Sequence, residues 1–164
     1  MPGERSDSVL LESWYPNLTA LNPDEKMDMV FWQTILEIRS AISKELEPLR
    51  ADKTIGSSLD AEVSLYVDTE LQVLLNSLQQ ELRFVLITSE ARVETFEQAD
   101  GSCIEASLES SGQTIKIKVS ASENTKCVRC WHHREDVGQN EEHPELCGRC
   151  IENVAGDGEI RQFA

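Results

Sequence analysis

Apolar side chains recur every three or four residues in the stretch that follows residue 22. The recurring positions are Met27, Phe31, Ile35, Ile38, Ile42, Leu46 and Leu49. This spacing places them on one face of an amphipathic helix, where core packing is favoured over a partner-binding role. Asn22 and Pro23 suit the N-cap and the first helical position, and Pro48 lacks the amide proton that a continuing helix needs. We therefore predict a long helix over residues 22–47.

Shorter periodic segments follow this helix. Residues 63–67 alternate apolar and polar side chains with the period of two expected for a strand, and residues 68–82 return to helical spacing. Residues 84–88 are rich in β-forming side chains and either end that helix or begin another strand. Two more alternating segments, residues 104–108 and 115–119, flank a Ser-Ser-Gly-Gln turn and predict a β-hairpin.

Together these elements predict an α+β fold. We expect a long amphipathic helix and a shorter helix to pack on a small, mainly antiparallel sheet. Along the chain we expect an extended lead-in at residues 1–22, this α+β body at residues 23–125, and a separate cysteine-rich module at residues 126–164. The polar segment Ala121–Thr125 is a candidate linker between the last two.

Composition and charge narrow the class of protein. The chain has 164 residues, of which 40% are hydrophobic, and its longest apolar run, Phe84–Ile87, is far shorter than the roughly 18 residues of a membrane span. We therefore expect no membrane contact. Thirty acidic residues against 15 Lys and Arg give a formal net charge of -15, which repels phosphate polymers. The charge argues against a non-specific nucleic-acid coat, so any contact with nucleic acid must be local.

Four of the five cysteines lie in the last quarter of the chain as two CxxC pairs. The pairs are Cys127-Val-Arg-Cys130 and Cys147-Gly-Arg-Cys150, a spacing typical of zinc ribbons. Soft thiolates select zinc or iron, and four of them satisfy the tetrahedral preference of Zn²⁺, which we expect. We predict a zinc-ribbon-like module in which four cysteines bind one Zn²⁺, in a reducing, cytoplasmic compartment.

A metal with four protein ligands has no open coordination position, so we expect a structural ion without which the module unfolds. Histidines between the pairs are the less favoured alternative ligands: His132, His133 and His143. Basic side chains beside or inside the pairs are placed to offset the thiolate charge: Lys126, Arg129 and Arg149. Cys103 stands apart in a predicted strand, where we expect a small buried residue rather than a catalytic one.

The segment after the first pair, Trp131-His132-His133-Arg134, carries groups that can stack on unpaired bases and bind phosphate. The alternative for Trp131 is that it covers the metal site as the core of the module. We favour this core position for Trp131 and a surface contact for Arg134.

Residues 126–164 closely resemble the C-terminal zinc-binding end of bacterial isoleucyl-tRNA synthetases. The similarity includes the CxRCW segment at the first pair, the LCxRC segment at the second, and the NVxGxGExRxFA ending. A looser similarity covers the PGERxxSV lead-in at Pro2–Val9, the long helix, and the IGSSLDA segment at residues 55–61. The resemblance implies that this chain is the C-terminal part of a much larger ligase, which joins isoleucine to its tRNA with ATP.

The resemblance also implies a role for the chain. It implies support of tRNA binding near the anticodon arm, with Cys127, Cys130, Cys147 and Cys150 as zinc ligands and no catalytic residue in the chain. The implied partners are the tRNA(Ile) anticodon arm and the remaining domains of the ligase. Candidate RNA contacts are Trp131, His132, Arg134, Arg149 and Arg161.

Two alternatives remain open at this point. The module could be purely architectural, clamping onto the parent enzyme without touching RNA. The cysteine spacing also resembles the zinc finger of formamidopyrimidine-DNA glycosylases, which begin Met-Pro and use the proline amine as nucleophile, and this chain begins Met1-Pro2-Gly3-Glu4. The shifted start, the short chain and the acidic body make the glycosylase alternative the weaker one.

Overall fold

The computed structural model describes residues 8–11, 17, 19–20 and 26–163. Most of the predicted lead-in therefore lies outside the described residues. The helical elements are η1 (Val9–Leu11), α1 (Met29–Ala51), η2 (Ser58–Asp60), α2 (Thr69–Asn76), η3 (Gln79–Glu81), α3 (Leu82–Leu86), η4 (Phe96–Gln98) and α4 (Gly148–Ala155). The strands are β1 (Ala61–Val67), β2 (Glu90–Thr95), β3 (Ile104–Ser107), β4 (Thr114–Ala121), β5 (Thr125–Lys126) and β6 (His133–Arg134).

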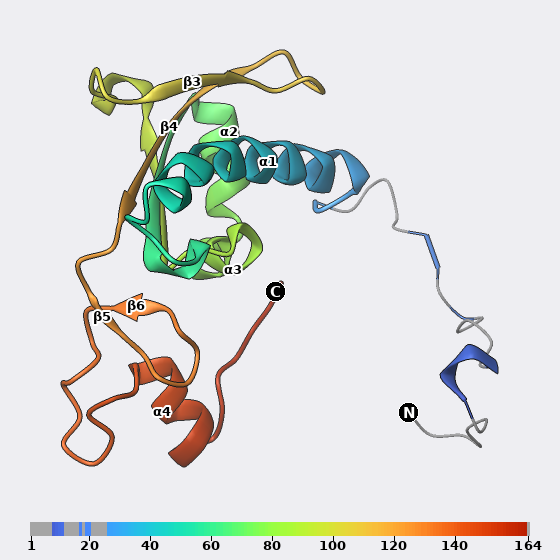
Figure 1. Cartoon of the computed structure of the whole chain (residues 1–164). Helices are drawn as coiled ribbons and strands as arrows, with labels where there is room; N and C mark the ends of the chain where they lie inside the picture. Colours follow the sequence, from blue (N-terminus) through green and yellow to red (C-terminus); the bar gives the residue numbers. More distant parts are fainter. Residues whose placement is uncertain (1–7, 12–16, 18, 21–25, 164) are drawn as a thin grey trace.

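The body is built on a four-stranded sheet with strand order β2-β1-β4-β3. β1 pairs in parallel with β2 and antiparallel with β4, and β3 pairs antiparallel with β4. The long helix α1 packs beside this sheet, with α2 and α3 nearby (Figure 1). The predicted α+β fold with a mainly antiparallel sheet is therefore confirmed.

The long helix begins later and ends later than its pattern predicts. Asp28, rather than Asn22, is the N-cap, and its Oδ1 accepts a hydrogen bond from the backbone N–H of Phe31 at 2.8 Å. Asn22 and Pro23 lie outside the described residues. Pro48 lies inside α1, which continues to Ala51. Proline costs the helix one hydrogen bond, but its fixed φ is helical, and the buried Leu46 keeps this turn against the core.

The predicted helix over residues 68–82 is interrupted. Asp68 caps α2, which ends at Asn76. After η3, the short helix α3 covers the first part of residues 84–88, the segment that the pattern left open between a helix end and a strand. Ile87 ends α3 in a left-handed conformation, with φ 58°. The sequence analysis overlooked β2, although Ala91 and Val93 alternate with Glu90, Arg92 and Glu94, and both apolar residues pack against the core.

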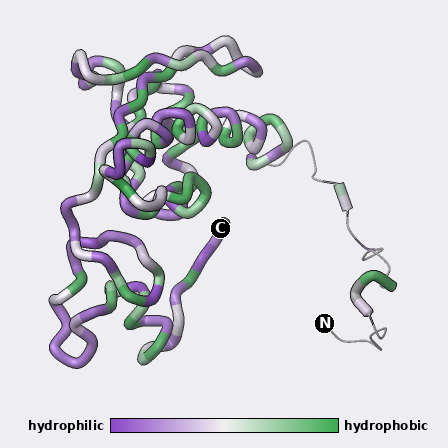
Figure 2. The backbone as a smooth tube through the Cα atoms, in the orientation of Figure 1, coloured by the Kyte–Doolittle hydropathy of each residue, from purple (hydrophilic) through white to green (hydrophobic). Residues whose placement is uncertain are grey.

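One apolar core lies between the helices and the sheet. It contains the stripe of α1 together with inward-facing residues of β1, α2 and β4, including Ile35, Ile38, Val63, Leu75 and Ile117. The cysteine-rich module lies below the body, and its loops are mostly hydrophilic (Figures 1 and 2). Among the described residues, no helix is both long and apolar enough to cross a bilayer.

We expect Ile38→Ala to lower the free energy of unfolding by about 2–5 kcal/mol, because it opens a cavity in the core. Ile38 is 0% exposed, whereas Leu36 on the same helix is 57% exposed. The matched control Leu36→Ala should change stability by no more than about 0.5 kcal/mol. Urea unfolding followed by circular dichroism measures both, and equal effects would show that the apolar face of α1 has been assigned wrongly.

Candidate metal centre and its contacts with the body

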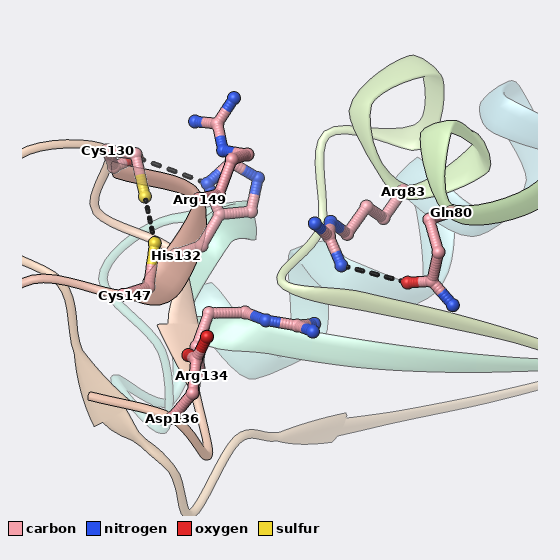
Figure 3. A pocket seen from close by; sticks show the side chains of 8 residues that line it. All are labelled: Gln80, Arg83, Cys130, His132, Arg134, Asp136, Cys147 and Arg149. Carbon is pink, nitrogen blue, oxygen red and sulfur yellow. Dashed lines mark hydrogen bonds between the residues drawn. The ribbon is translucent and has the colours of Figure 1, made fainter. Parts of the chain in front are cut away.

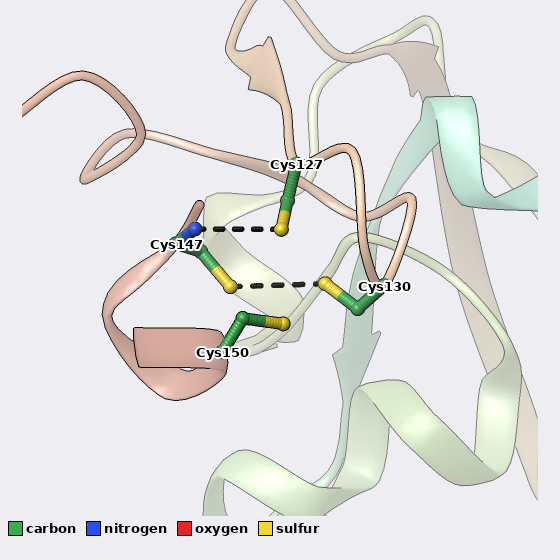
Figure 4. A group of neighbouring side chains, drawn as sticks. All are labelled: Cys127, Cys130, Cys147 and Cys150. Carbon is green, nitrogen blue, oxygen red and sulfur yellow. Dashed lines mark hydrogen bonds between the residues drawn. The ribbon is translucent and has the colours of Figure 1, made fainter. Parts of the chain in front are cut away.

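Four sulfurs converge on one point in the C-terminal module. The ligand atoms of Cys127, Cys130, Cys147 and Cys150 all lie within 4.8 Å of one another (Figure 4). The Cys130 and Cys147 sulfurs are 3.7 Å apart. A tetrahedron with Zn–S bonds of about 2.3 Å has edges of about 3.8 Å, so this separation suits a tetrathiolate zinc site. The four cysteines are positioned to bind one metal ion.

Two different backbone devices position these sulfurs. In the first knuckle, residues 127–131 close a tight turn in which the Trp131 N–H donates to the Cys127 carbonyl at 2.9 Å. In the second, Cys147 is the N-cap of α4 and Cys150 lies in its first turn. The Cys147 N–H also donates to the Cys127 sulfur at 3.4 Å, which ties the two knuckles together (Figure 4).

Burial and crowding separate the acidities of the four thiols. Burial raises the pKa of Cys147 and Cys150, and neighbouring sulfurs raise both further. Burial also acts on Cys130, but hydrogen bonds from the His132 backbone and the Arg149 side chain outweigh it and lower its pKa to about 7. Since a metal ligand must be a thiolate, binding at this site releases protons and weakens in acid.

The ligand set is closed, which fits a structural role for the metal. Among the described residues, the only group of metal-binding side chains that clusters closely enough is the four cysteines. Two of the three histidine alternatives are engaged elsewhere: the His133 Nε2 lies 3.2 Å from Asp60, and the buried His132 packs on Phe84. His143 is not part of the cysteine cluster. Cys103 is half-buried one residue before β3, so its predicted position inside a strand is wrong.

Asp60 anchors the module to the body. Its Oδ1 accepts from the Lys126 Nζ at 3.0 Å and lies 3.2 Å from the His133 Nε2, so one carboxylate holds both short strands β5 and β6. Its Oδ2 accepts backbone N–H groups of Gly56 at 3.0 Å and Ser57 at 2.8 Å. Lys126 is therefore paired with this carboxylate and was wrongly expected to offset the thiolate charge.

A second anchor lies at the start of β2. The Arg134 Nη1 is 2.6 Å from a Glu90 carboxylate oxygen, in an ion pair whose side chains are 20% and 21% exposed. The adjacent His133 N–H donates to the Ser89 hydroxyl at 2.6 Å. Arg134 thus joins the module to the body.

Phe84 of α3 is the aromatic contact between body and module. The guanidinium carbons of Arg83, Arg149 and Arg161 lie 4.8, 4.9 and 4.6 Å from its ring centroid. The His132 ring meets it edge-on, with centroids 5.5 Å apart. Cation–π contacts of this kind stabilise each guanidinium against the ring face. One body residue thereby contacts groups from the segment after the first knuckle, from the second knuckle and from the tail.

The C-terminal tail returns from α4 to α3 (Figure 1). The backbone N–H groups of Gln162 and Phe163 donate to the two carboxylate oxygens of Glu81, at 2.6 and 2.7 Å. Glu159 pairs with both Arg149 and Arg161, at 2.9 and 3.0 Å. The tail is therefore bonded to the body at one end and to the second knuckle at the other.

A cavity of about 210 Å³ lies between α3 and the knuckles. Gln80 and Arg83 face it from the body, and the module contributes Cys130, His132, Arg134, Asp136, Cys147 and Arg149 (Figure 3). Burial, together with the charges of Arg134 and Arg149, lowers the pKa of Arg83. The body and module thus meet across charged groups rather than through a shared apolar core.

The five candidate RNA contacts differ in exposure. Trp131 is 62% exposed at a left-handed position with φ 67°, so the favoured core position for it is wrong. His132 is 8% exposed. The side chains of Arg134 and Arg149 are 20% and 18% exposed and ion-paired, whereas that of Arg161 is 41% exposed.

Sequence reasoning missed the body residues that receive the module. These residues are Asp60, Glu81, Phe84, Ser89 and Glu90. Their partners lie between 44 and 82 positions away in the sequence, so no local pattern identifies them. Arg129 was noted only for its charge, but it is exposed on the first knuckle, two positions before Trp131.

Comparison with known proteins agrees with this site. Residues 125–153 match a family model described as the zinc finger found in FPG and IleRS. The whole chain is 52% identical to isoleucine–tRNA ligase of Alkalilimnicola ehrlichii, 53% identical to that of Thioalkalivibrio sulfidiphilus, and 46% identical to that of Pseudomonas aeruginosa. Each match covers 100% of this chain, and the chain spans 17% of each relative.

We expect Cys147→Ser to reduce bound zinc well below one ion per chain, because it removes one of four ligands worth together about 10–16 kcal/mol. Hydrogen exchange should then become fast in residues 125–163 while α1 and β1 stay protected. Cys103→Ser, outside the cluster, is the matched control and should retain one zinc. Full protection of the module in the Cys147 variant would contradict a structural metal.

Asp60 makes the stability of the chain depend on pH. Burial opposes its ionisation, but hydrogen bonds from Lys126, Ser57 and Gly56 outweigh burial and lower its pKa from 3.8 to about 2. Because the folded pKa lies below the unfolded one, its stabilisation is complete above about pH 4 and is lost as pH falls toward 2.

We therefore expect Asp60→Asn to be less stable than the parent by about 1–2 kcal/mol at pH 7, with the difference shrinking in acid. Thermal unfolding at several pH values measures this difference. Glu47→Gln, which removes an exposed pair on α1, should cost less than about 0.5 kcal/mol at every pH. A pH-independent deficit in the Asp60 variant would contradict the assignment.

Proposed function

On the premise that this chain is a segment of an isoleucine–tRNA ligase with a zinc finger, we propose that it is the C-terminal region of that enzyme and supports tRNA binding. The observation that carries the proposal is the identity of 46–53% over the whole chain. In the proposed parent, isoleucine is joined to tRNA(Ile) with ATP at an active site in the remaining domains. The partners are then those domains and the tRNA anticodon arm, in the cytoplasm.

The proposed RNA-binding surface is the first knuckle, which we define as residues 127–131. Trp131 supports this proposal because its large ring is 62% exposed, and Val128 beside it is 56% exposed. Arg129, also exposed, adds a cation at the same place. An aromatic ring next to a guanidinium can stack on an unpaired base and contact its phosphate. With a net charge of -15 on the chain, such a contact has to be local.

The other candidates divide by their exposure. Arg161 pairs with Glu159, but its side chain is 41% exposed, and it remains a candidate phosphate contact at the edge of the tail. His132, Arg134 and Arg149 are mostly buried by their intramolecular partners, and we propose that they support the surface rather than touch RNA. We expect the chain alone to bind tRNA weakly, because exposed charges act only over about 8 Å at physiological salt.

The architectural role is the second candidate, and the polar anchors at Asp60 and Glu90 favour it. In that case the module braces the ligase and Trp131 contacts no RNA. The glycosylase alternative is not favoured. The description of the zinc-finger family names both FPG and IleRS. The relatives that match the whole of this chain, however, are isoleucine–tRNA ligases.

We expect Trp131→Ala in the full-length ligase to raise the KM for tRNA about 10-fold, because base stacking contributes about 1–3 kcal/mol. Arg129→Gln should raise this KM less and reduce its salt dependence. Steady-state aminoacylation at two salt concentrations measures both effects.

Ile160→Ala is the matched control, since Ile160 is 90% exposed on the tail of the same module. It should leave the KM for tRNA unchanged, and the Trp131 and Ile160 variants should both retain one zinc. An unchanged KM in the Trp131 variant would favour the architectural role instead. Absence of isoleucylation by the full-length parent would reject the ligase proposal itself.

A further inference from the structure

Each knuckle carries an arginine at the same position, and each arginine lies near the other knuckle. Arg129, before Cys130 in the first pair, donates from Nη1 to the Cys150 sulfur at 3.6 Å. Arg149, before Cys150 in the second pair, lines the same cavity as Cys130 and helps to lower the pKa of that thiol (Figure 3). Each arginine is therefore placed to act on the last cysteine of the opposite pair.

From this arrangement we infer that Arg129 and Arg149 form an arginine clasp that retains the metal ion by offsetting the charge of its thiolates. Neither residue is a metal ligand. Both act through cysteines that are, so they are positioning residues of the metal centre. This inference does not depend on the RNA-binding proposal.

The charge of the centre explains why two cations are needed. Four thiolates and one Zn²⁺ sum to -4 + 2 = -2, and the two guanidinium groups bring the total to zero. Hydrogen bonds from cations are about twice as strong as neutral ones, and they favour the thiolate over the protonated thiol. A cysteine ligand that stays a thiolate, rather than taking up a proton, dissociates less readily from the metal.

The two arginines differ in how firmly they are held. Arg149 is 18% exposed at its side chain, pairs with Glu159 at 2.9 Å, and lies 4.9 Å from the Phe84 ring centroid. Arg129 is exposed, and its contact with Cys150 joins the first knuckle to the second without involving the body. Because Arg149 is fixed by the tail and the body, the clasp also links metal retention to docking of the module on Phe84.

The test is zinc release from the complete 164-residue chain, loaded with one zinc and mixed with a chromophoric chelator at fixed pH. We expect Arg129→Gln and Arg149→Gln each to release zinc about 10-fold faster than the parent, since partners of metal ligands typically contribute 10–100-fold in affinity. Arg129→Lys should restore part of the loss, because lysine keeps the charge without the planar donor fork. Arg50→Gln, on α1, is the control and should release zinc at the parental rate.

A second measurement separates the clasp from a purely structural effect. In the cobalt-loaded chain, the sulfur-to-metal charge-transfer band should shift in both Gln variants and not in Arg50→Gln, because the thiolates lose a hydrogen-bond donor. If Arg149→Gln fails to fold, Arg129→Gln alone tests the inference, because the Arg129 side chain is exposed and its replacement should not disturb folding. Parental release rates in Arg129→Gln, or an unmoved cobalt band, would overturn the inference.

Discussion

The convergence of four sulfurs on one point is the constraint on which the C-terminal module depends. The body has its own extensive apolar core, but the core of the module consists of three buried cysteines with Cys130, Val137 and Leu146 packed around them. So few apolar side chains cannot offset the conformational entropy that the module loses when it becomes ordered. A structural metal supplies folding free energy directly, which makes metal binding and folding of the module a single event.

Orientation of the module is a separate matter, and it rests on charged contacts. Asp60 holds the two short strands, Glu90 holds Arg134, and Glu81 receives the backbone of the tail. Exposed ion pairs contribute little individually. Here the Asp60 and Glu90 carboxylates are only about one-fifth exposed, and the contacts together attach three separate segments of the module. Phe84 supplies a rigid face among them. A metal site built by local turns is thereby fixed against the sheet by contacts that are distant in sequence.

Local patterns predicted those parts of the molecule that local physics determines. The apolar stripe of α1, the hairpin of β3 and β4, and the two CxxC knuckles all follow from spacing within a few residues. The start of α1 at Asp28 depended on which of two capping residues the surrounding fold could use. The six residues of β2 alternate, but their pairing with β1 is what establishes them as a strand. The anchors to the module were beyond reach, because Asp60 and His133 are 73 positions apart.

The metal-binding turn also determines the conformation of an exposed residue, Trp131. The turn that aims Cys127 and Cys130 at one point forces the next residue into a left-handed conformation, with φ 67°. Glycine or asparagine adopts this conformation at little cost, whereas other side chains are strained by about 1–2 kcal/mol. A tryptophan there gains no burial in return, being 62% exposed. Enclosure of the metal therefore holds an outward-facing aromatic ring in place, and a binding role for that ring would account for a residue that packing alone does not explain.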